Sequence, residues 1–302
     1  MSEYSANSKI LISSDGTRIY ADASGNPERP GIVFIHGQGL SGAVFDVIFS
    51  DKRFTEEFYL MKVRYDMRGH GRSGKPDTSE AYESKPYADD FAAVMKAFNL
   101  RKPVVVGWSL GSTVCADIAA HLPDTTLAGI VYLAGVPYVG DIVPKICSPE
   151  IIGMRPKLFD ETSVTTFVTT IKENIDSLFL DTTKIPWDLK CFWIGMAASQ
   201  RPTHRKLSLS RSQDPTRLFE LAAQGLPLLI LGGKYDRQVN QENLIEELRP
   251  RFKDMEMCII EKGGSHAVFY ENPGEVMERI IVFARRVKAE VGHFYSFSQK
   301  SD

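Results

Sequence analysis

A serine stands between two glycines where an apolar run of the sequence passes into a helical pattern. The segment reads Gly107-Trp108-Ser109-Leu110-Gly111 and matches G-x-S-x-G, a motif that gains weight from this strand-to-helix context. A chain that reverses within about one residue strains the backbone of the serine and leaves no room for side chains at the two glycines. The hydroxyl of Ser109 would then stand above a sheet at the start of a helix, where N–H groups favour a developing negative charge. We therefore interpret Ser109 as a nucleophile rather than as a simple helix cap.

A serine hydroxyl is a weak nucleophile near neutral pH and needs a neighbouring base. Among the six histidines, His266 follows the last apolar run through a Gly-Gly-Ser loop, which lets an imidazole reach over the edge of a sheet. Asp236 directly follows the preceding apolar run, so the chain order is Ser109, Asp236, His266, as the strand-turn-helix context of the serine leads us to expect. We predict that His266 takes the serine proton and that Asp236 orients its ring. An Asx-type turn is the structural alternative for Asp236.

Other polar residues are weaker candidates for the same chemistry. Asp66 is the alternative carboxylate, but it stands too early in the chain order and is expected to tie down its own glycine-rich loop. His36 and His70 lie in strand-exit loops and are candidates for the floor of the site. The remaining histidines are interpreted as structural or exposed: His121, His204 and His293.

Two backbone N–H groups are candidates for an oxyanion hole, the site that binds the negatively charged oxygen of a transition state. Gln38 lies between two glycines after a buried-strand pattern, and Leu110 comes next after the nucleophile. Their N–H groups could converge on one carbonyl oxygen, and one such donor is typically worth ~3 kcal/mol of barrier. The side chain of Gln38 is then left for substrate or for solvent.

Short apolar runs supply the strands that must position these residues. The first two runs are joined by Ser14-Asp15-Gly16, which predicts a hairpin. The later runs lack alternation, which is typical of strands buried on both faces of a parallel sheet. The eight predicted strands cover 9–13, 17–23, 31–37, 59–66, 103–107, 129–135, 227–233 and 255–261.

Helical patterns alternate with these strands, at 87–99, 114–122 and 276–287. The alternation predicts an α/β fold, with a doubly wound, mostly parallel eight-stranded sheet and the antiparallel hairpin at its leading edge. From 139 to 224 no strand pattern appears, while prolines and the helical stretches 164–179 and 187–198 predict a helical insertion. We therefore predict a core of residues 1–138 and 225–292, a helical insertion of 139–224, and a flexible tail of 293–302.

Composition argues against several classes of function. The chain has 302 residues, 43% of them hydrophobic, a formal net charge of −2 and a pI of about 6.3, so nothing indicates binding to nucleic acid or to an anionic membrane. No apolar run reaches the ~18 residues of a membrane span. Four scattered cysteines lack metal-ligand spacing, so no metal site is predicted, and they favour reduced thiols in a cytoplasmic protein.

Taken together, these segments resemble the α/β-hydrolase fold family, and within it the single-domain hydrolases that carry a helical cap. The resemblance covers nearly the whole chain and rests on residues 36–39, 66–73, 107–111, 236 and 264–266. It implies a catalytic triad of Ser109, His266 and Asp236, and it identifies the helical insertion as the cap. Epoxide hydrolases and haloalkane dehalogenases carry an aspartate where this chain has Ser109, which argues against both activities.

We expect a cofactor-independent hydrolase that cleaves a carboxylic ester or a related acyl compound through an acyl-enzyme on Ser109, with a small apolar ester or acyl compound as its substrate. No oligomeric state is predicted. Four residues are candidates for the substrate pocket, although aromatic residues at helical spacing also suit a core: Trp108, Trp187, Trp193 and Met196. The same triad serves lactonases, thioesterases, carbon–carbon bond hydrolases and perhydrolases, and some relatives are receptors with slow turnover. A carbon–carbon bond hydrolase would need basic groups on the insertion, for which the weak candidates are Arg201, Arg205 and Lys206.

Overall fold

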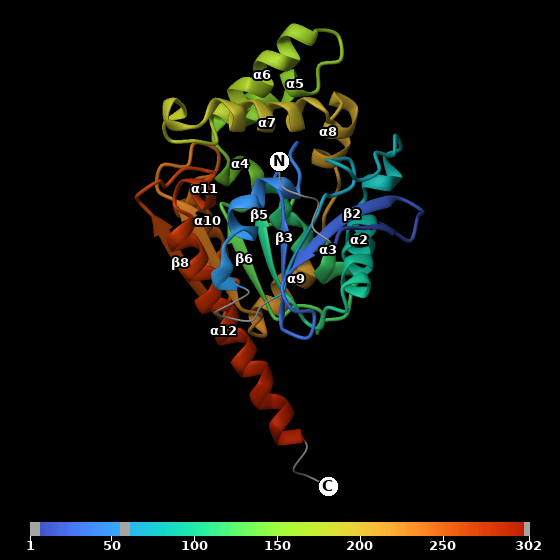
Figure 1. Cartoon of the computed structure of the whole chain (residues 1–302), viewed down its shortest axis with the longest axis vertical. Coiled ribbons are helices and arrows are strands. Elements are labelled where there is room, and N and C mark those ends of the chain that lie inside the picture. The colour runs from blue at the N-terminus through green and yellow to red at the C-terminus, as the bar shows by residue number, and fades with distance from the viewer. Residues whose placement is uncertain (1–6, 55–60, 299–302) are drawn as a thin grey trace.

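One eight-stranded sheet runs through the centre of the chain (Figure 1). The computed structural model describes residues 7–54 and 61–298, and the side chains among them except those of residues 54 and 289–298. The strand order is β1-β2-β4-β3-β5-β6-β7-β8. The strands are β1 (Lys9–Ile12), β2 (Arg18–Ser24), β3 (Gly31–Ile35), β4 (Met61–Tyr65), β5 (Val104–Trp108), β6 (Gly129–Leu133), β7 (Leu228–Gly233) and β8 (Met255–Ile260).

Strand pairing gives a mostly parallel sheet with an antiparallel edge. β1 pairs antiparallel with β2 and β2 pairs antiparallel with β4, whereas all the other neighbours run parallel. The prediction of a mostly parallel eight-stranded sheet with a hairpin at its leading edge is therefore confirmed. Because the carboxyl ends of parallel strands meet at one edge, the loops that follow them lie together there.

The apolar runs are buried as their composition predicts, except in the two edge strands: β8, and β1, in which Ile10 and Ile12 are 45% and 63% exposed. Every residue of β3, β5, β6 and β7 is buried. β8 is mostly half-buried, and Met257 within it is 44% exposed. The reason is position: β1 and β8 are the outermost strands of the sheet, and each has a neighbour on one side only.

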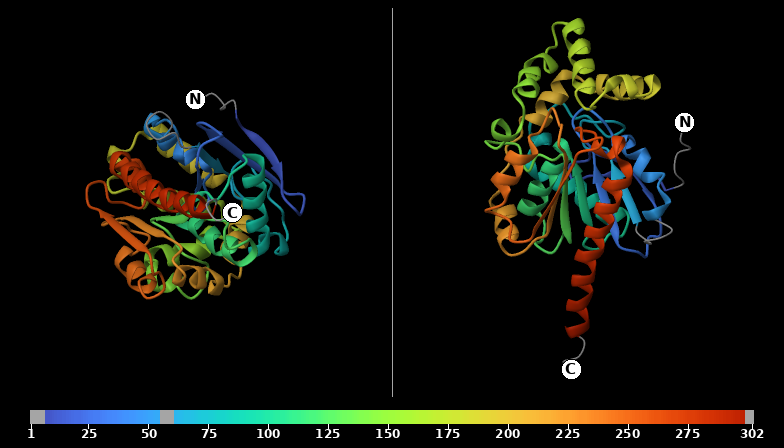
Figure 2. Two further views of the ribbon diagram at one scale, coloured as in Figure 1. Left: turned by 90° about the horizontal axis from the view of Figure 1, so that it is seen from below. Right: turned by 90° about the vertical axis from the view of Figure 1, so that its left-hand side faces the viewer.

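Helices cover both faces of the sheet (Figure 2). Side chains of α2, α3, α9 and α10 belong to one hydrophobic cluster, and those of α1, α11 and α12 belong to a second. The helices are α1 (Asp46–Phe49), α2 (Ser84–Ala97), α3 (Val114–His121), α4 (Val143–Ile146), α5 (Pro149–Leu158), α6 (Val164–Asp176), α7 (Trp187–Ala198), α8 (Pro202–Leu209), α9 (Thr216–Ala223), α10 (Gln241–Leu248), α11 (Val268–Glu271) and α12 (Pro273–Ser298).

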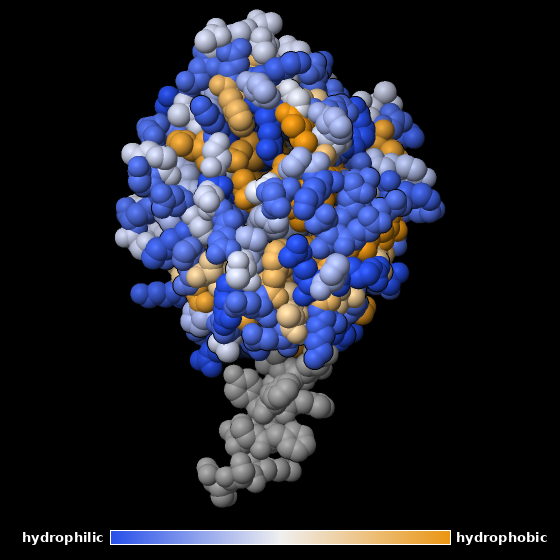
Figure 3. All heavy atoms as spheres, turned by 180° about the vertical axis from the view of Figure 1, so that it is seen from behind, coloured by the Kyte–Doolittle hydropathy of each residue, from blue (hydrophilic) through white to orange (hydrophobic). Residues whose placement is uncertain are grey.

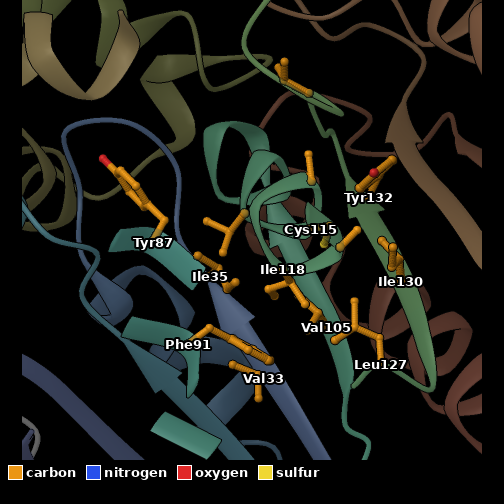
Figure 4. Close-up of a cluster of buried hydrophobic side chains, with 14 of the residues drawn as sticks. Val33, Ile35, Tyr87, Phe91, Val105, Cys115, Ile118, Leu127, Ile130 and Tyr132 are labelled. Carbon is orange, nitrogen blue, oxygen red and sulfur yellow. The ribbon is translucent and has the colours of Figure 1, made fainter. Parts of the chain in front are cut away.

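The two clusters explain why the strands need apolar residues at every position. Successive side chains of a strand point to opposite faces. In β3, Val33 and Ile35 enter one cluster, while Ile32 and Phe34 enter the other. Figure 4 shows the first of these clusters, to which α3 contributes Ile118.

The segment between β6 and β7 forms the helices α4 to α9, and α5, α6, α7 and α8 lie beyond one end of the sheet (Figure 1). The predicted helical stretches at 164–179 and 187–198 correspond to α6 and α7. The last helix of the predicted insertion behaves differently. Leu218 and Ala222 of α9 are fully buried in the core cluster that contains α3, so this helix packs with the sheet.

The C-terminal helix α12 extends to Ser298. The predicted tail of 293–302 ends in residues 299–302, which lie outside the described part of the chain, and its flexibility stays a prediction. Among the described residues, no helix combines the length and the apolar character that crossing a bilayer requires. On the face drawn in Figure 3, polar residues predominate and apolar patches are interspersed between them.

Candidate active site

Ser109 occupies a strained turn at the carboxyl end of β5. Strand β5 ends at Trp108, and a short 3₁₀ helix (η4, Ser109–Thr113) begins at the next residue. The backbone of Ser109 has φ +52°, a left-handed value that non-glycine residues rarely adopt. A Cβ atom at Gly107 would stand 2.3 Å from Cα of Ser112, and one at Gly111 would stand 2.2 Å from the carbonyl oxygen of Ile35. The steric reason for both glycines is therefore confirmed.

His266 and Asp236 meet at the same edge of the sheet, from the loops after β8 and β7. The Nδ1 atom of His266 lies 3.0 Å from Oδ1 and 2.9 Å from Oδ2 of Asp236, and both side chains are 1% exposed. A carboxylate accepts hydrogen bonds, so Nδ1 carries the hydrogen and Nε2 keeps its lone pair. Nε2 is buried and has no hydrogen-bond partner among the described residues. The arrangement leaves Nε2 ready to accept a proton.

Asp236 is held rigidly by its own turn. Its Oδ1 accepts the N–H groups of Gln238 at 2.8 Å and Val239 at 3.1 Å, and its Oδ2 accepts Nε2 of Gln241 at 3.0 Å. The Asx-type turn and the contact with His266 are thus present together. The backbone of His266 is held as well: Nε1 of Trp108 donates to its carbonyl oxygen at 3.0 Å, which ties the histidine loop to the end of β5.

One cavity brings the candidate residues together. Its lining includes Ser109 and His266 as well as Gln38 and Leu110. Leu110 is the second residue of η4, and the first N–H groups of a helix have no acceptor within it. The side chain of Gln38 differs from expectation, because it is committed to the helical insertion: Nε2 donates to Oε1 of Gln200 at 3.0 Å, and Oε1 accepts Oγ of Ser208 at 3.2 Å.

The pocket prediction needs correction for three of its four residues. Trp108 lines the cavity, whereas Trp187, Trp193 and Met196 do not. Trp187 is 75% exposed at the start of α7. Trp193 is a core residue whose ring centroid lies 6.0 Å from that of Trp108 and 5.1 Å from that of Phe179. Met196 instead accepts a hydrogen bond from Oγ of Ser41 through its sulfur, at 3.1 Å.

The residues that take their place come mostly from the insertion. Apolar walls are supplied by α4, α5 and α8 and by Leu178, which follows α6. Polar groups are supplied by Arg155, Asn174, Arg205 and Gln238. Of these four, the sequence analysis singled out Arg205 alone, as a weak candidate. Nothing local in the sequence distinguishes Arg155 or Asn174 from the other polar residues of amphipathic helices.

The alternative carboxylate and the strand-exit histidines serve the loops around the site. The carboxylate of Asp66 accepts hydrogen bonds from N–H of Gly42 at 2.8 Å and from Nε of Arg72 at 2.9 Å. It therefore holds its own glycine-rich loop in place, as expected. His36 is buried and accepts N–H of Met67 at Nε2, at 3.0 Å. Burial lowers the pKa of His36, which keeps the ring neutral. None of Asp66, His36 and His70 lines the cavity.

Comparison with known proteins gives a consistent picture. The model of the Alpha/beta hydrolase family matches residues 32–279. The chain is 26% identical over 272 residues to the AB hydrolase superfamily protein YisY of Bacillus subtilis. This match covers 85% of this chain and 91% of that protein. The chain is 33% identical over 153 residues to a non-heme chloroperoxidase of Streptomyces lividans, spanning 50% of this chain and 51% of the other. The matches to this chloroperoxidase and to several other curated relatives span about half of the length of those proteins or less.

A solved structure extends the likeness to three dimensions. A putative aryl esterase from Burkholderia cenocepacia superposes with a TM-score of 0.81 at 26% identity. The superposition covers 94% of this chain and all of that protein.

Proposed function

Because the chain belongs to the alpha/beta hydrolase family, we propose that it is a cofactor-independent serine hydrolase that cleaves a carboxylic ester or a related acyl compound. The observation that carries the proposal is the state of His266. Its Nδ1 is bound to the Asp236 carboxylate, and its Nε2 is buried without a partner among the described residues. The same imidazole lines a cavity together with Ser109. This is the arrangement that a general base for a serine nucleophile requires.

In the proposed reaction, Oγ of Ser109 attacks the substrate carbonyl carbon while its proton passes to Nε2 of His266. Asp236 stabilises the imidazolium that forms. The carbonyl oxygen becomes an oxyanion, which accepts the backbone N–H groups of Gln38 and Leu110. When the tetrahedral intermediate collapses, His266 returns the proton to the leaving alcohol and the acyl group stays on Ser109.

The second half of the reaction repeats these steps with water. Nε2 of His266 takes a proton from a water molecule, which attacks the acyl carbon through a second oxyanion intermediate. Collapse of this intermediate breaks the bond to Oγ, His266 returns the proton to Ser109, and the carboxylic acid leaves. A cytoplasmic location is part of the proposal, and the four free thiols of the chain support it.

The test is turnover of a panel of para-nitrophenyl esters with short and medium acyl chains. We expect Ser109→Ala to lower kcat by roughly 10³-fold or more while the fold stays intact. Ser210→Ala, which changes an exposed serine at the end of α8, is the matched control and should keep the full rate. A Ser109→Ala variant with near-wild-type kcat would refute the role of the serine. Release of a single equivalent followed by a stall would favour a slow-turnover receptor over an enzyme.

The similarity to a protein named non-heme chloroperoxidase favours one second candidate. Hydrogen peroxide would replace water in the attack on the acyl-enzyme, giving a peracid and free Ser109. A peracid can oxidise a halide ion and return to the carboxylic acid. The test is peracid formation from an ester substrate with added hydrogen peroxide, and release of the acid alone under these conditions would exclude this candidate.

A further inference from the structure

Arg205 is a buried cation that has no acidic partner among the described residues. The residue lies on α8, is 1% exposed and lines the cavity that contains Ser109. Its Nη2 donates to the carbonyl oxygen of Ala197 at 2.8 Å, and its Nε is buried without a partner among the described residues. No carboxylate in the described part of the chain lies within ion-pair distance of it. A guanidinium has five N–H donors, so most of this group's hydrogen-bonding capacity is unused.

The other buried arginines of this chain show what is missing. Arg68 pairs with Asp90 at 2.7 Å, Arg211 pairs with Asp117 at 3.1 Å, and Arg64 pairs with Asp22 at 2.8 Å. Burying a charge costs a large free energy unless a counter-charge compensates for it. Among the described residues, a counter-charge is thus present at three buried arginines and absent at Arg205, which is the one that lines the cavity with Ser109.

The guanidinium of Arg205 is charged and close to the oxyanion loop. Burial lowers its pKa to about 10, which still leaves it protonated near neutral pH. It packs against Gly39, next to Gln38, where a Cβ atom would stand 2.6 Å from Nη1. A glycine at this position therefore makes room for the guanidinium.

A second cation lines the same cavity. Arg155 of α5 is half-buried and has no ion pair with a described residue. The lining holds no aspartate or glutamate among the described residues, and its remaining polar side chains include the amides of Asn174 and Gln238. The Asp236 carboxylate is bound to His266 and its own turn. The cavity thus has apolar walls, two cations and no acidic side chain of its own.

We propose that Arg205, assisted by Arg155, binds a carboxylate carried by the substrate, so that the natural substrate is an acyl compound with a second, anionic end. The planar guanidinium matches a carboxylate in geometry, and such charge-assisted hydrogen bonds are stronger than neutral ones. The inference rests on the proposed function, because the carboxylate belongs to a compound whose carbonyl group reacts at Ser109. A substrate with an anionic end takes the place of the small apolar ester that the sequence led us to expect.

The test compares two substrates that differ in one terminal group: the para-nitrophenyl half-ester of glutaric acid, and para-nitrophenyl pentanoate with the same five-carbon acyl chain. We expect the wild-type chain to prefer the anionic half-ester in kcat/KM. Arg205→Gln should lower the ratio of the two kcat/KM values by roughly 10- to 100-fold. The loss should appear mainly as a higher KM for the half-ester, because a group remote from the reacting carbon binds substrate and transition state alike.

Two further variants keep the test decisive. Arg155→Gln should lower the same ratio by about 10-fold. This variant tests the anion site even if Arg205→Gln fails to fold. Lys206→Gln removes an exposed positive charge from the next position of α8 and should leave the ratio unchanged. A wild-type chain without preference for the half-ester, or a ratio unchanged in folded Arg205→Gln and Arg155→Gln, would overturn the inference.

A binding measurement separates this inference from the proposed function. Calorimetry with glutarate on the Ser109→Ala chain needs no turnover, and we expect binding that Arg205→Gln in the same background weakens at least ~10-fold. Glutarate binding without any ester turnover would refute the proposed function and support the anion site. Ester turnover without glutarate binding would refute the anion site alone.

Discussion

Replacing Asp236 by asparagine tests whether the carboxylate sets the tautomer of His266. Asparagine has nearly the same shape, and its oxygen can still accept the N–H groups of Gln238 and Val239 that form the turn. The other carboxylate oxygen, which lies 2.9 Å from Nδ1 of His266, becomes an NH₂ group. A donor at that distance favours the tautomer in which Nδ1 is the acceptor and Nε2 carries the hydrogen. His266 then has no lone pair to take the proton of Ser109.

The magnitude of the effect follows from that loss. An asparagine in the orienting position of a Ser-His-Asp triad lowers kcat by about 10⁴-fold, which corresponds to about 5.5 kcal/mol of barrier. Stability should change far less, by at most about 2 kcal/mol. Asp236→Asn keeps the turn, and it loses the charge on its hydrogen bonds and the single bond that Nε2 of Gln241 donates to the replaced oxygen. Activity and stability are therefore expected to separate.

The assay is kcat on a short para-nitrophenyl ester, with urea unfolding of the same preparations. Asp124→Asn is the matched control, because it removes a carboxylate that pairs with Arg217 at the surface. A kcat of Asp236→Asn within 10-fold of wild type, in a folded chain, would refute the reasoning about the tautomer. A loss of activity that merely follows a loss of folded protein would not support it either.

Two further predictions concern the surroundings of the site. Burial lowers the pKa of His36 and His70 below the usual 6.5, so the unfolded chain takes up protons below about pH 6.5 that the folded chain does not. Below that pH, the free energy of unfolding should fall by up to about 1.4 kcal/mol for each histidine per unit of decreasing pH. Urea unfolding at several pH values measures this dependence, which His70→Gln should weaken; an unchanged dependence in this variant would contradict the prediction. Gln200 connects Gln38 to the carbonyl oxygen of Gly69 by two hydrogen bonds of 3.0 Å. We expect Gln200→Ala to lower kcat about 10-fold with little change in KM or melting temperature. An unchanged kcat would show that Gln200 does not position the loop that carries Gln38.

The sheet could be predicted because its determinants are local. Each strand corresponds to an apolar run of the sequence, and the hairpin turn at Ser14-Asp15-Gly16 follows from its residue types. The turn at Ser109 is equally local, since the clashes that require Gly107 and Gly111 arise from the backbone path itself. The contact between Asp236 and His266 could be anticipated because both residues follow parallel strands, whose carboxyl ends share one edge.

The lining of the cavity could not be predicted, because it depends on how the inserted helices pack. Helix α7 carries apolar residues on all sides, so its sequence does not tell which side faces inward. The structure buries Trp193 and exposes Trp187 on the same helix. The unusual state of Arg205 likewise cannot be read from the sequence, because it depends on which distant residues pack around it, and none of those that the structure describes is an acidic partner.

Chemical labelling tests the central claim, that Ser109 is a nucleophile activated by His266. The chain is treated with a fluorophosphonate, digested, and analysed by mass spectrometry to locate the adduct. We predict a single adduct on Ser109 that forms rapidly in the wild-type chain and is lost in His266→Ala. An adduct at another residue, or equal labelling of Ser109 without the imidazole, would contradict the account.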